Sequence, residues 1–236
     1  MKAVIVAAGL GTRQKSRGDS KPLIPVLKIS LIERVILTAK KSGITKFCIV
    51  IGYNGDKIKN YLGNGNKLGA EIEYVQNDEW EKANGISVFK AKSCVKDSFI
   101  LLMADHIFDS RILDNLLETD VAKDECILCV DKNIPTYLDI EDATKVFSEN
   151  NRITNIGKEL KKYNMIDTGI FLCNPIIFDA LEESIKKGDD SISGGIRVLA
   201  QRNKMKSLTI GNYVWIDVDT EKDLQNAEKL LLKDLK

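Results

Sequence analysis

The sequence predicts an α/β fold in which a mostly parallel, mixed sheet is covered by helices on both faces. Apolar segments of strand length alternate along the chain with amphipathic segments of helix length, which is the pattern of a parallel sheet wrapped by helices. The segments 98–103 and 125–130 are apolar almost throughout, as strands buried on both faces are. A later hairpin pattern adds a small antiparallel insertion to this prediction.

The first half of the chain follows the alternation closely. A strand over 3–7 leads into a glycine-rich loop and then into a helix over 30–42, which Gly43 ends, because glycine readily adopts the left-handed conformation that closes a helix. The pattern next predicts a strand, a short helix, a strand, a helix and a strand, over 46–51, 56–62, 70–75, 85–93 and 98–103.

The second half departs from this order after the strand 125–130. The segments 144–148 and 152–156 flank Glu149-Asn150-Asn151, a turn signal that predicts an antiparallel hairpin. A strand, two helices and two short strands are expected over 169–173, 175–186, 193–202, 207–210 and 214–216. Thr220 begins the last helix with a capping box that ends at Asp223.

Composition limits the classes of function. The 236 residues suit one large domain, and we interpret 1–236 as a single domain. The 35 Lys and Arg residues balance the 34 Asp and Glu residues, so no net field favours nucleic acid or an acidic membrane surface. The N-terminal apolar run is shorter than the apolar core of a signal peptide. No apolar run in the sequence approaches the roughly 18 residues that cross a membrane. We therefore expect a cytoplasmic protein without membrane contact.

Five cysteines are scattered through apolar segments, at 48, 94, 126, 129 and 173. An odd number of cysteines with apolar neighbours is typical of buried free thiols, and we expect that state. Cys126 and Cys129 lie three residues apart in an expected strand, so they should point to opposite faces of the sheet and could not clamp one metal ion.

The loop after the first strand indicates phosphate binding. It reads Ala7-Ala8-Gly9-Leu10-Gly11-Thr12-Arg13, and Lys21-Pro22 follows shortly after it. Glycines let a backbone approach a polyphosphate closely, and consecutive N–H groups in such a loop bind its oxygens. Arg13 and Lys21 add positive charge. The alternative, that the glycines only make a turn, stays open on this evidence.

Two rival phosphate motifs fail at this loop. A dinucleotide fingerprint has a third glycine where this chain has Gln14, and a Walker loop continues with Gly-Lys-Ser/Thr where Gly11 is followed by Thr12.

Carboxylates follow buried strands, where a metal ion beside the phosphates would need them. Asp105 follows the strand 98–103, and Asp217 and Asp219 follow the short strand 214–216. Ligands of open α/β sheets gather at such strand ends. Capping of the next helix is the alternative role for these aspartates, and we assign that role to Asp223.

Three segments together resemble the signature of the sugar-phosphate nucleotidyltransferases: the loop from Ala8 to Arg13, Lys21-Pro22-Leu23, and Gly43-Ile44. The resemblance covers essentially the whole chain and implies the Rossmann-like nucleotide-diphospho-sugar transferase fold. In that family the loop wraps the triphosphate, and the Arg and Lys stabilise charge during transfer. The nucleotide is thus expected at Ala7, Ala8, Gly9, Leu10, Gly11, Thr12, Arg13, Lys21, Asn84, Gly85 and Ser87.

The resemblance also implies a magnesium site. Asp105 and Asp219 match the two aspartates that hold the ion, with Asp217 as a further ligand or neighbour, and Mg²⁺ prefers a few carboxylates together with phosphate oxygens and water. Asn84 and the residues after it would read the nucleobase, with a helix N-cap as the plain alternative. His106, the only histidine, is expected either to orient Asp105 or to touch substrate.

The acceptor site follows from the same resemblance. Lys158 is expected to contact the acceptor phosphate and to act in catalysis, and Asp167-Thr168-Gly169 to hold the acceptor hydroxyls. Lys145, in the hairpin, is a second candidate for contact with the acceptor. Exposed lysines without a specific role are the alternative.

Further segments resemble one branch more closely, the CTP:inositol-1-phosphate cytidylyltransferases: 83–87, 105–108, 141–145, 156–160, 167–169 and 215–220. Enzymes of that branch make CDP-inositol for compatible solutes and are often fused to a membrane transferase domain. We therefore expect this chain to be a stand-alone form of the cytidylyltransferase or a domain excised from such a fusion. A longer loop over 14–20 and Ala104 in place of a glycine depart from the pattern.

The expected activity is Mg²⁺-dependent condensation of CTP with inositol-1-phosphate. The alternatives are a phosphocholine or hexose-1-phosphate nucleotidyltransferase, a GTP-dependent molybdenum-cofactor nucleotidyltransferase, and a catalytically silent nucleotide-binding regulatory module.

Overall fold

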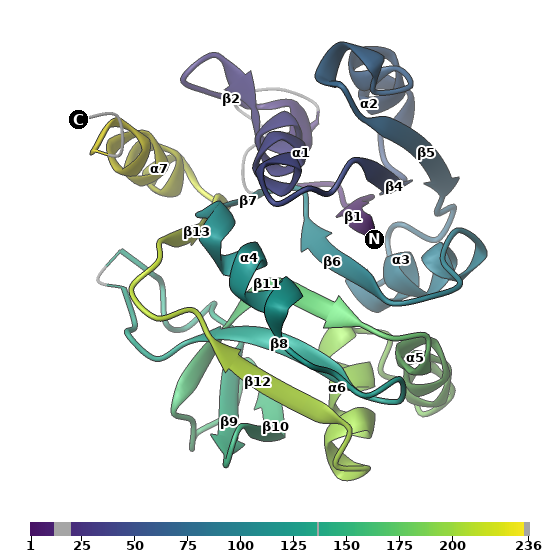
Figure 1. Cartoon of the computed structure of the whole chain (residues 1–236), viewed down its shortest axis with the longest axis vertical. Coiled ribbons are helices and arrows are strands. Elements are labelled where there is room, and N and C mark those ends of the chain that lie inside the picture. The colour runs from purple at the N-terminus through teal and green to yellow at the C-terminus, as the bar shows by residue number, and fades with distance from the viewer. Residues whose placement is uncertain (12–19, 136, 234–236) are drawn as a thin grey trace.

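The computed structural model describes residues 1–11, 20–135 and 137–233. Within them, a nine-stranded sheet runs in the order β5, β4, β1, β6, β11, β8, β12, β10, β9 (Figure 1). The first four strands of that order are mutually parallel, as predicted. Their bounds are β5 Glu71–Gln76, β4 Lys46–Ile51, β1 Lys2–Ala7 and β6 Phe99–Met103.

The sheet changes direction at β11 (Met165–Cys173), which is antiparallel to both β6 and β8 (Cys126–Asp131). Beyond it, β12 (Met205–Thr209) runs parallel to β8. The expected hairpin is confirmed as β9 (Lys145–Glu149) and β10 (Arg152–Gly157). Its turn places Asn150 and Asn151 at positive φ, 50° and 59°, a conformation that asparagine tolerates better than most residues.

Helices cover both faces of the sheet, and each face has its own core. One core receives α1 (Leu31–Lys41), α2 (Gly55–Leu62) and α4 (Ser110–Glu118). The other receives α3 (Asn84–Lys90), α5 (Ile176–Lys186) and α6 (Ile192–Gln201). Along β8, Cys126 packs into the second core and Cys129 into the first, which confirms the prediction that they point to opposite faces.

A third, smaller core joins the segment 24–31 to the C-terminal part of the chain. The last helix, α7 (Glu221–Lys233), packs through Leu224 and Ala227 against β2 (Pro25–Val26) and the start of α1. The expected capping box is present, because the Asp223 carboxylate accepts from the backbone N–H of Thr220 at 2.8 Å and the Asp223 N–H donates to Thr220 Oγ1 at 3.2 Å. The minor elements of the described residues include 3₁₀ helices over Lys21–Leu23, Asn66–Leu68 and Ala91–Ser93 and the short strand β3 Ile29–Ser30.

The prediction gave no element to the segment after β6, where the structure forms β7 (His106–Phe108) and α4. Asp109 caps α4 by accepting from the Arg111 N–H at 2.9 Å. This cap, and the apolar spacing of Ile112, Leu113 and Leu116, were present in the sequence as a helix signal. The strand β7 pairs with β13 (Trp215–Asp217) in a separate antiparallel sheet.

The expectation of free thiols throughout is wrong for two of the five cysteines. Cys48 on β4 and Cys94 form a disulfide, with Cα atoms 6.6 Å apart. The 3₁₀ turn that carries Cys94 follows α3 and packs on the same face of the sheet as Cys48, and tertiary packing of this kind brings together residues that a local pattern treats separately. Cys126, Cys129 and Cys173 are free and buried, as expected.

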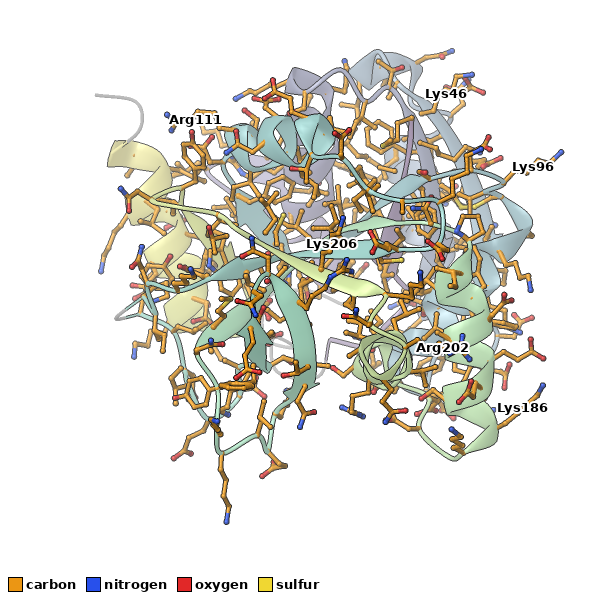
Figure 2. The ribbon with its side chains drawn as sticks, turned by 60° about the horizontal axis from the view of Figure 1, so that its bottom comes forward. Lys46, Lys96, Arg111, Lys186, Arg202 and Lys206 are labelled. Carbon is orange, nitrogen blue, oxygen red and sulfur yellow. A yellow bond between two sulfur atoms is a disulfide. The ribbon has the colours of Figure 1, made fainter. Side chains whose placement is uncertain are left out.

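The labelled basic side chains of the described residues are spread over several elements (Figure 2). Basic side chains labelled in Figure 2 project from different elements, among them Lys46 on β4, Lys186 on α5 and Lys206 on β12. Among the described helices, none combines the length and the apolar character that crossing a membrane demands.

Candidate active site

The glycine-rich loop leads from the end of β1 into a cavity of about 310 Å³, which Ala7, Gly9 and Gly11 line. Gly11 has φ +62°, and a Cβ on it would lie 2.6 Å from Lys21 Cβ, so only glycine lets this backbone pass so close to the lysine stem. Ala8 is buried, and its carbonyl accepts from the Tyr53 N–H at 3.0 Å. Leu10 is half-buried. Thr12 and Arg13 lie outside the described residues.

Lys21 extends its ammonium into a group of three carboxylates. Its Nζ lies 2.5 Å from Asp105 Oδ2, 2.5 Å from Asp219 Oδ1 and 3.9 Å from Asp217 Oδ1. The lysine is 8% exposed. Burial alone would lower the pKa of Lys21, but the neighbouring carboxylates outweigh it and raise that pKa above its ordinary value.

The small sheet of β7 and β13 brings these carboxylates together. It pairs Asp217 with His106, and the Val218 N–H donates to the Asp105 carbonyl at 3.1 Å. Two segments that are distant in sequence thereby present their aspartates to one point. Burial raises the pKa of Asp217 to about 7, against the opposing effect of His106 and Lys21.

His106 both orients Asp105 and faces the larger cavity described below. Its Nδ1 lies 2.9 Å from Asp105 Oδ1, and its ring stacks on Trp215 with centroids 6.2 Å apart. A Cβ on Gly169, which has φ +70°, would lie 2.6 Å from His106 Nε2, so glycine at 169 makes room for the imidazole. Burial lowers the pKa of His106, but Asp217 and Asp105 outweigh it and raise that pKa to about 9.

The donor set fits a divalent cation. Asp105, His106 and Asp217 offer ligand atoms that all lie within 4.8 Å of one another, and the two aspartates supply carboxylate oxygens, the ligand type that hard divalent cations prefer. Asp217 Oδ1 is buried and makes no hydrogen bond within the described residues, and such an orphaned oxygen is costly unless a partner binds it. The Lys21 ammonium lies between Asp105 and Asp219, where it balances part of their charge.

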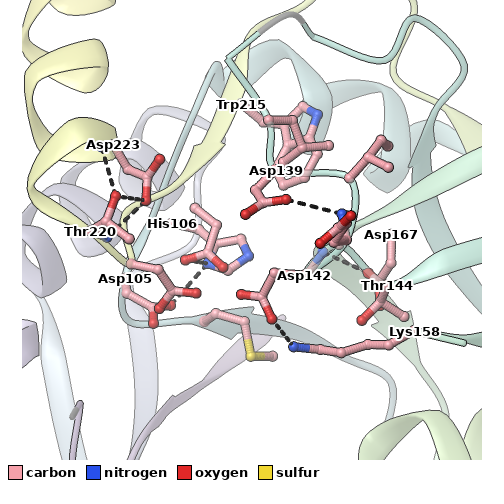
Figure 3. A pocket seen from close by; sticks show the side chains of 18 of the residues that line it. Asp105, His106, Asp139, Asp142, Thr144, Lys158, Asp167, Trp215, Thr220 and Asp223 are labelled. Atoms are coloured by element: carbon pink, nitrogen blue, oxygen red, sulfur yellow. Dashed lines mark hydrogen bonds and ion pairs between the residues drawn. The ribbon is translucent and has the colours of Figure 1, made fainter. Parts of the chain in front are cut away.

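A larger cavity of about 790 Å³ opens beside the smaller one, and Asp105 and Asp219 line both. Figure 3 shows Lys158 reaching toward the labelled acidic side chains of this cavity, where its Nζ lies 2.5 Å from Asp142 Oδ1. Asp167 accepts from the Gly169 N–H at 2.7 Å. Burial raises the pKa of Asp167 to about 6, although that hydrogen bond and His106 lower it.

Two expected acceptor residues do not line this cavity. Thr168 is fully buried and donates from Oγ1 to the Cys129 carbonyl at 2.7 Å. Lys145 is 8% exposed, and its Nζ donates to the Lys158 carbonyl at 2.6 Å. Both support the wall from behind, and their contact with an acceptor stays a prediction.

The expected base-reading residues lie at the start of α3. Asn84 lines both cavities, and its Oδ1 accepts from the Ile192 N–H at 3.1 Å, while Ala83 holds the N-cap position. A Cβ on Gly85 would lie 2.5 Å from the Asp190 carbonyl, so this glycine allows close packing against the 190–191 backbone. Ser87 lines the smaller cavity and accepts from Asn77 Nδ2 at 2.9 Å.

The sequence prediction missed several residues that line the cavities: Pro22, Trp80, Lys82, Met103, Tyr137, Asp139 and Trp215. Their positions depend on how loops fold over the strand ends, for which no local pattern exists. Trp80 carried a weak signal, because the chain has only 2 tryptophans.

Known proteins are similar to this chain in sequence and in fold. A model of the nucleotidyl transferase family matches residues 2–234. The bifunctional IPC transferase and DIPP synthase of Aquifex aeolicus is 34% identical over 98% of this chain and 52% of its own length. The chain thus spans about half the length of the curated relatives it matches.

Solved structures confirm the predicted fold. The inositol-1-phosphate CTP transferase from T. maritima superposes with a TM-score of 0.86 at 28% identity, over 98% of this chain and 95% of that one. A putative glucose-1-phosphate thymidylyltransferase from Bacillus anthracis superposes with a TM-score of 0.82 at 21% identity, over 98% and 94% of the two chains, and shows the fold alone.

Proposed function

Because the chain belongs to the nucleotidyl transferase family, we propose that it transfers the cytidylyl group of CTP to inositol-1-phosphate and releases pyrophosphate. One observation carries this proposal: a loop-lined cavity with Lys21 and a larger acidic cavity meet at Asp105 and Asp219. A phosphoryl donor and an acceptor bound on either side would meet at those carboxylates. The names of the Aquifex and T. maritima relatives support CTP and inositol-1-phosphate as the pair.

The reaction is an in-line displacement. An ionised oxygen of the acceptor phosphate attacks the α-phosphorus of CTP, the new P–O bond forms, and the bond to the β-phosphate oxygen breaks with pyrophosphate as leaving group. No proton is removed, since that oxygen is already ionised near neutral pH, so the site requires no general base. Positioning and charge stabilisation therefore make up the catalytic work.

The donor side holds the triphosphate. Backbone N–H groups of the loop from Ala7 to Gly11 and the Lys21 ammonium would neutralise the phosphates, and Arg13 is proposed to add a second cation to the leaving pyrophosphate. Asp105, Asp219 and Asp217 would hold Mg²⁺, which supplies a positive charge shared between carboxylates and phosphate oxygens when bound. His106 keeps the Asp105 carboxylate turned toward this point through the 2.9 Å contact.

The acceptor side suits a hydroxyl-rich ring with one phosphate. Asp139, Asp142 and Asp167 line the larger cavity, and carboxylates accept hydrogen bonds from ring hydroxyls. Lys158 is the cation expected to meet the acceptor phosphate, which would compete with Asp142 for its ammonium. The expected cytoplasmic location is part of the same proposal.

Pyrophosphate release tests the function. CTP, UTP, GTP and ATP are each combined with inositol-1-phosphate, phosphocholine and glucose-1-phosphate in the presence of Mg²⁺. Turnover confined to CTP with inositol-1-phosphate is the expected result. Turnover with another pair would overturn the substrate assignment and keep the reaction, whereas nucleotide binding without release from any pair would favour a regulatory module.

A further inference from the structure

Trp80 lies in the wall of the smaller cavity, and the phosphate chemistry gives it no role. It shares that wall with Gly9, Gly11 and Lys21 on one side and with Asn84 and Ser87 on the other. The side chain is half-buried, so part of its indole surface remains open to the cavity.

The surroundings hold Trp80 in place. A Cβ on Gly52 would lie 2.5 Å from Trp80 Cβ and 2.7 Å from the Ala8 carbonyl, so the strand end at Gly52 separates the tryptophan from the phosphate loop by a single backbone. The Tyr53 ring also contacts the indole, with the two ring centroids 5.2 Å and the ring planes 55° apart. The indole is therefore pre-positioned, as a rigid binding surface should be.

The opposite side of the same turn is also fixed. Asn77 is fully buried, its Oδ1 accepts from the Glu79 N–H at 2.9 Å, and its Nδ2 donates to Ser87 Oγ at 2.9 Å. These bonds join the turn that carries Trp80 to α3, which carries Asn84. The aromatic face and the expected base-reading amide thus belong to one connected unit.

The charges in the cavity decide which part of a nucleotide meets Trp80. Phosphates belong with Lys21 and the loop N–H groups, and the α-phosphorus must reach Asp105 and Asp219. Trp80, Asn84 and Ser87 form part of the remaining wall together with Lys82, whose ammonium pairs with Glu79. Beside that ion pair, the wall offers one aromatic face and two polar groups. That combination suits the flat, polar-edged base of the nucleotide.

We propose that Trp80 is a nucleobase-binding residue that packs its indole against the face of the base. This inference rests on the proposed nucleotidyl transfer and deepens it at the donor site. Because every base presents a similar aromatic face, stacking adds affinity for any nucleotide that enters, and discrimination between bases falls to hydrogen-bonding groups such as Asn84.

Tryptophan fluorescence gives a direct readout of this contact. The chain has 2 tryptophans, and the other one, Trp215, is 3% exposed and donates from Nε1 to Asp131 at 2.9 Å. Titration of the protein with CTP should quench the emission of Trp80, and the Trp80→Phe variant should bind CTP without that quench. CTP binding to the unmodified protein, followed by calorimetry, with no change in emission would overturn the inference.

The energetic test uses Trp80→Ala and Trp80→Leu, both checked for an unchanged melting temperature. Loss of base stacking weakens binding by about five- to hundredfold, so calorimetry should show that loss for CTP and nearly unchanged binding of inorganic triphosphate, which has no base. Tyr61→Ala removes a 47% exposed aromatic on α2 and serves as the matched control, with unchanged affinity for both ligands.

The outcomes separate the two proposals. Equal weakening for CTP and inorganic triphosphate would show that Trp80 only supports the loop, and unchanged CTP affinity in both aliphatic variants would show that the base lies elsewhere. If the proposed function is wrong, CTP should bind without release of pyrophosphate. The fluorescence and calorimetry experiments measure only CTP binding, so they still test the role of Trp80 in that case.

Discussion

Replacing Lys21 with methionine should destabilise the protein in the absence of metal, and a divalent cation should restore the loss. The substitution keeps most of the buried stem and removes the ammonium that lies 2.5 Å from both Asp105 and Asp219. Removing one partner from a buried ion pair costs about 3–5 kcal/mol. The aspartate side chains here are 27% and 19% exposed, so water screens part of the repulsion and we expect about 2–3 kcal/mol.

That cost converts into a measurable melting shift. Unfolding entropy near the midpoint is about 2.1 cal/mol/K per residue, or about 0.5 kcal/mol/K for a chain of this length, so the melting temperature should fall by about 4–6 °C in EDTA. A cation bound at a hundredfold excess over its dissociation constant stabilises the native state by about 2.7 kcal/mol. Mg²⁺ without nucleotide should therefore raise the melting temperature of Lys21→Met clearly more than that of the unmodified protein.

Lys206→Met is the matched control, because Lys206 pairs with Glu125 at 2.8 Å, away from the two cavities. The melting temperature of Lys206→Met should rise with Mg²⁺ no more than that of the unmodified protein. In a direct binding measurement, the affinity for Mn²⁺ should increase in Lys21→Met and stay unchanged in Lys206→Met. Equal melting of Lys21→Met and the unmodified protein in EDTA, or equal stabilisation of both by Mg²⁺, would refute the view that the lysine balances the carboxylates at the metal site.

Three further predictions follow from the structure. Asp105→Asn should lower turnover by about a hundredfold or more while the melting temperature stays within a few degrees, because charge stabilisation in the transition state is lost; near-normal turnover at saturating Mg²⁺ would contradict the metal assignment. Reducing the disulfide between Cys48 and Cys94, which are 46 residues apart, should lower the free energy of unfolding by about 4 kcal/mol by the chain-entropy relation. The melting temperature of the unmodified protein should therefore fall when reductant is added. The melting temperature of the Cys48→Ala, Cys94→Ala double variant should not respond to reductant. Lys206 and Arg152 lower the pKa of Glu125 from 4.5 to about 2. The ionised Glu125 therefore stabilises the fold above pH 4.5, and this stabilisation is lost as the pH falls toward 2. Across that pH window, urea unfolding should show a smaller fall in the free energy of unfolding for Glu125→Gln than for the unmodified protein, and an equal fall in both would count against the ion pairs.

Local patterns in the sequence predicted most of the sheet, because strand periodicity and turn residues act over short range. The opposite orientations of Cys126 and Cys129 follow from the two-residue period of a strand alone. The disulfide of Cys48 was beyond such reasoning, since its partner is defined by how a turn after α3 packs on the sheet. The helix α4 was missed although its Asp109 cap was visible.

In the candidate site, too, local patterns predicted some features and tertiary packing determined the others. Residue types and strand ends identified Asp105, Asp217 and Asp219, but only the pairing of β7 with β13 shows how they converge. Lys21 was expected at the phosphates, and in the structure its ammonium lies among the carboxylates, because these are the counter-charges within its reach. Thr168 and Lys145 were expected at the acceptor, yet neither lines the larger cavity, because their side chains are buried and bind backbone carbonyls of Cys129 and Lys158.

The antiparallel strand β11 lies between the elements that carry the proposed donor cavity and those that carry the proposed acceptor cavity. The loop, Lys21 and Trp80 come from the parallel strands before Asp105, whereas Lys158 and Asp167 come from the hairpin and β11 after it. The two cavities have Asn84, Met103, Asp105 and Asp219 in common. Substitutions around the acceptor cavity could therefore change which phosphorylated compound binds there while the nucleotide site is kept. The same fold could in this way serve the synthesis of different activated metabolites.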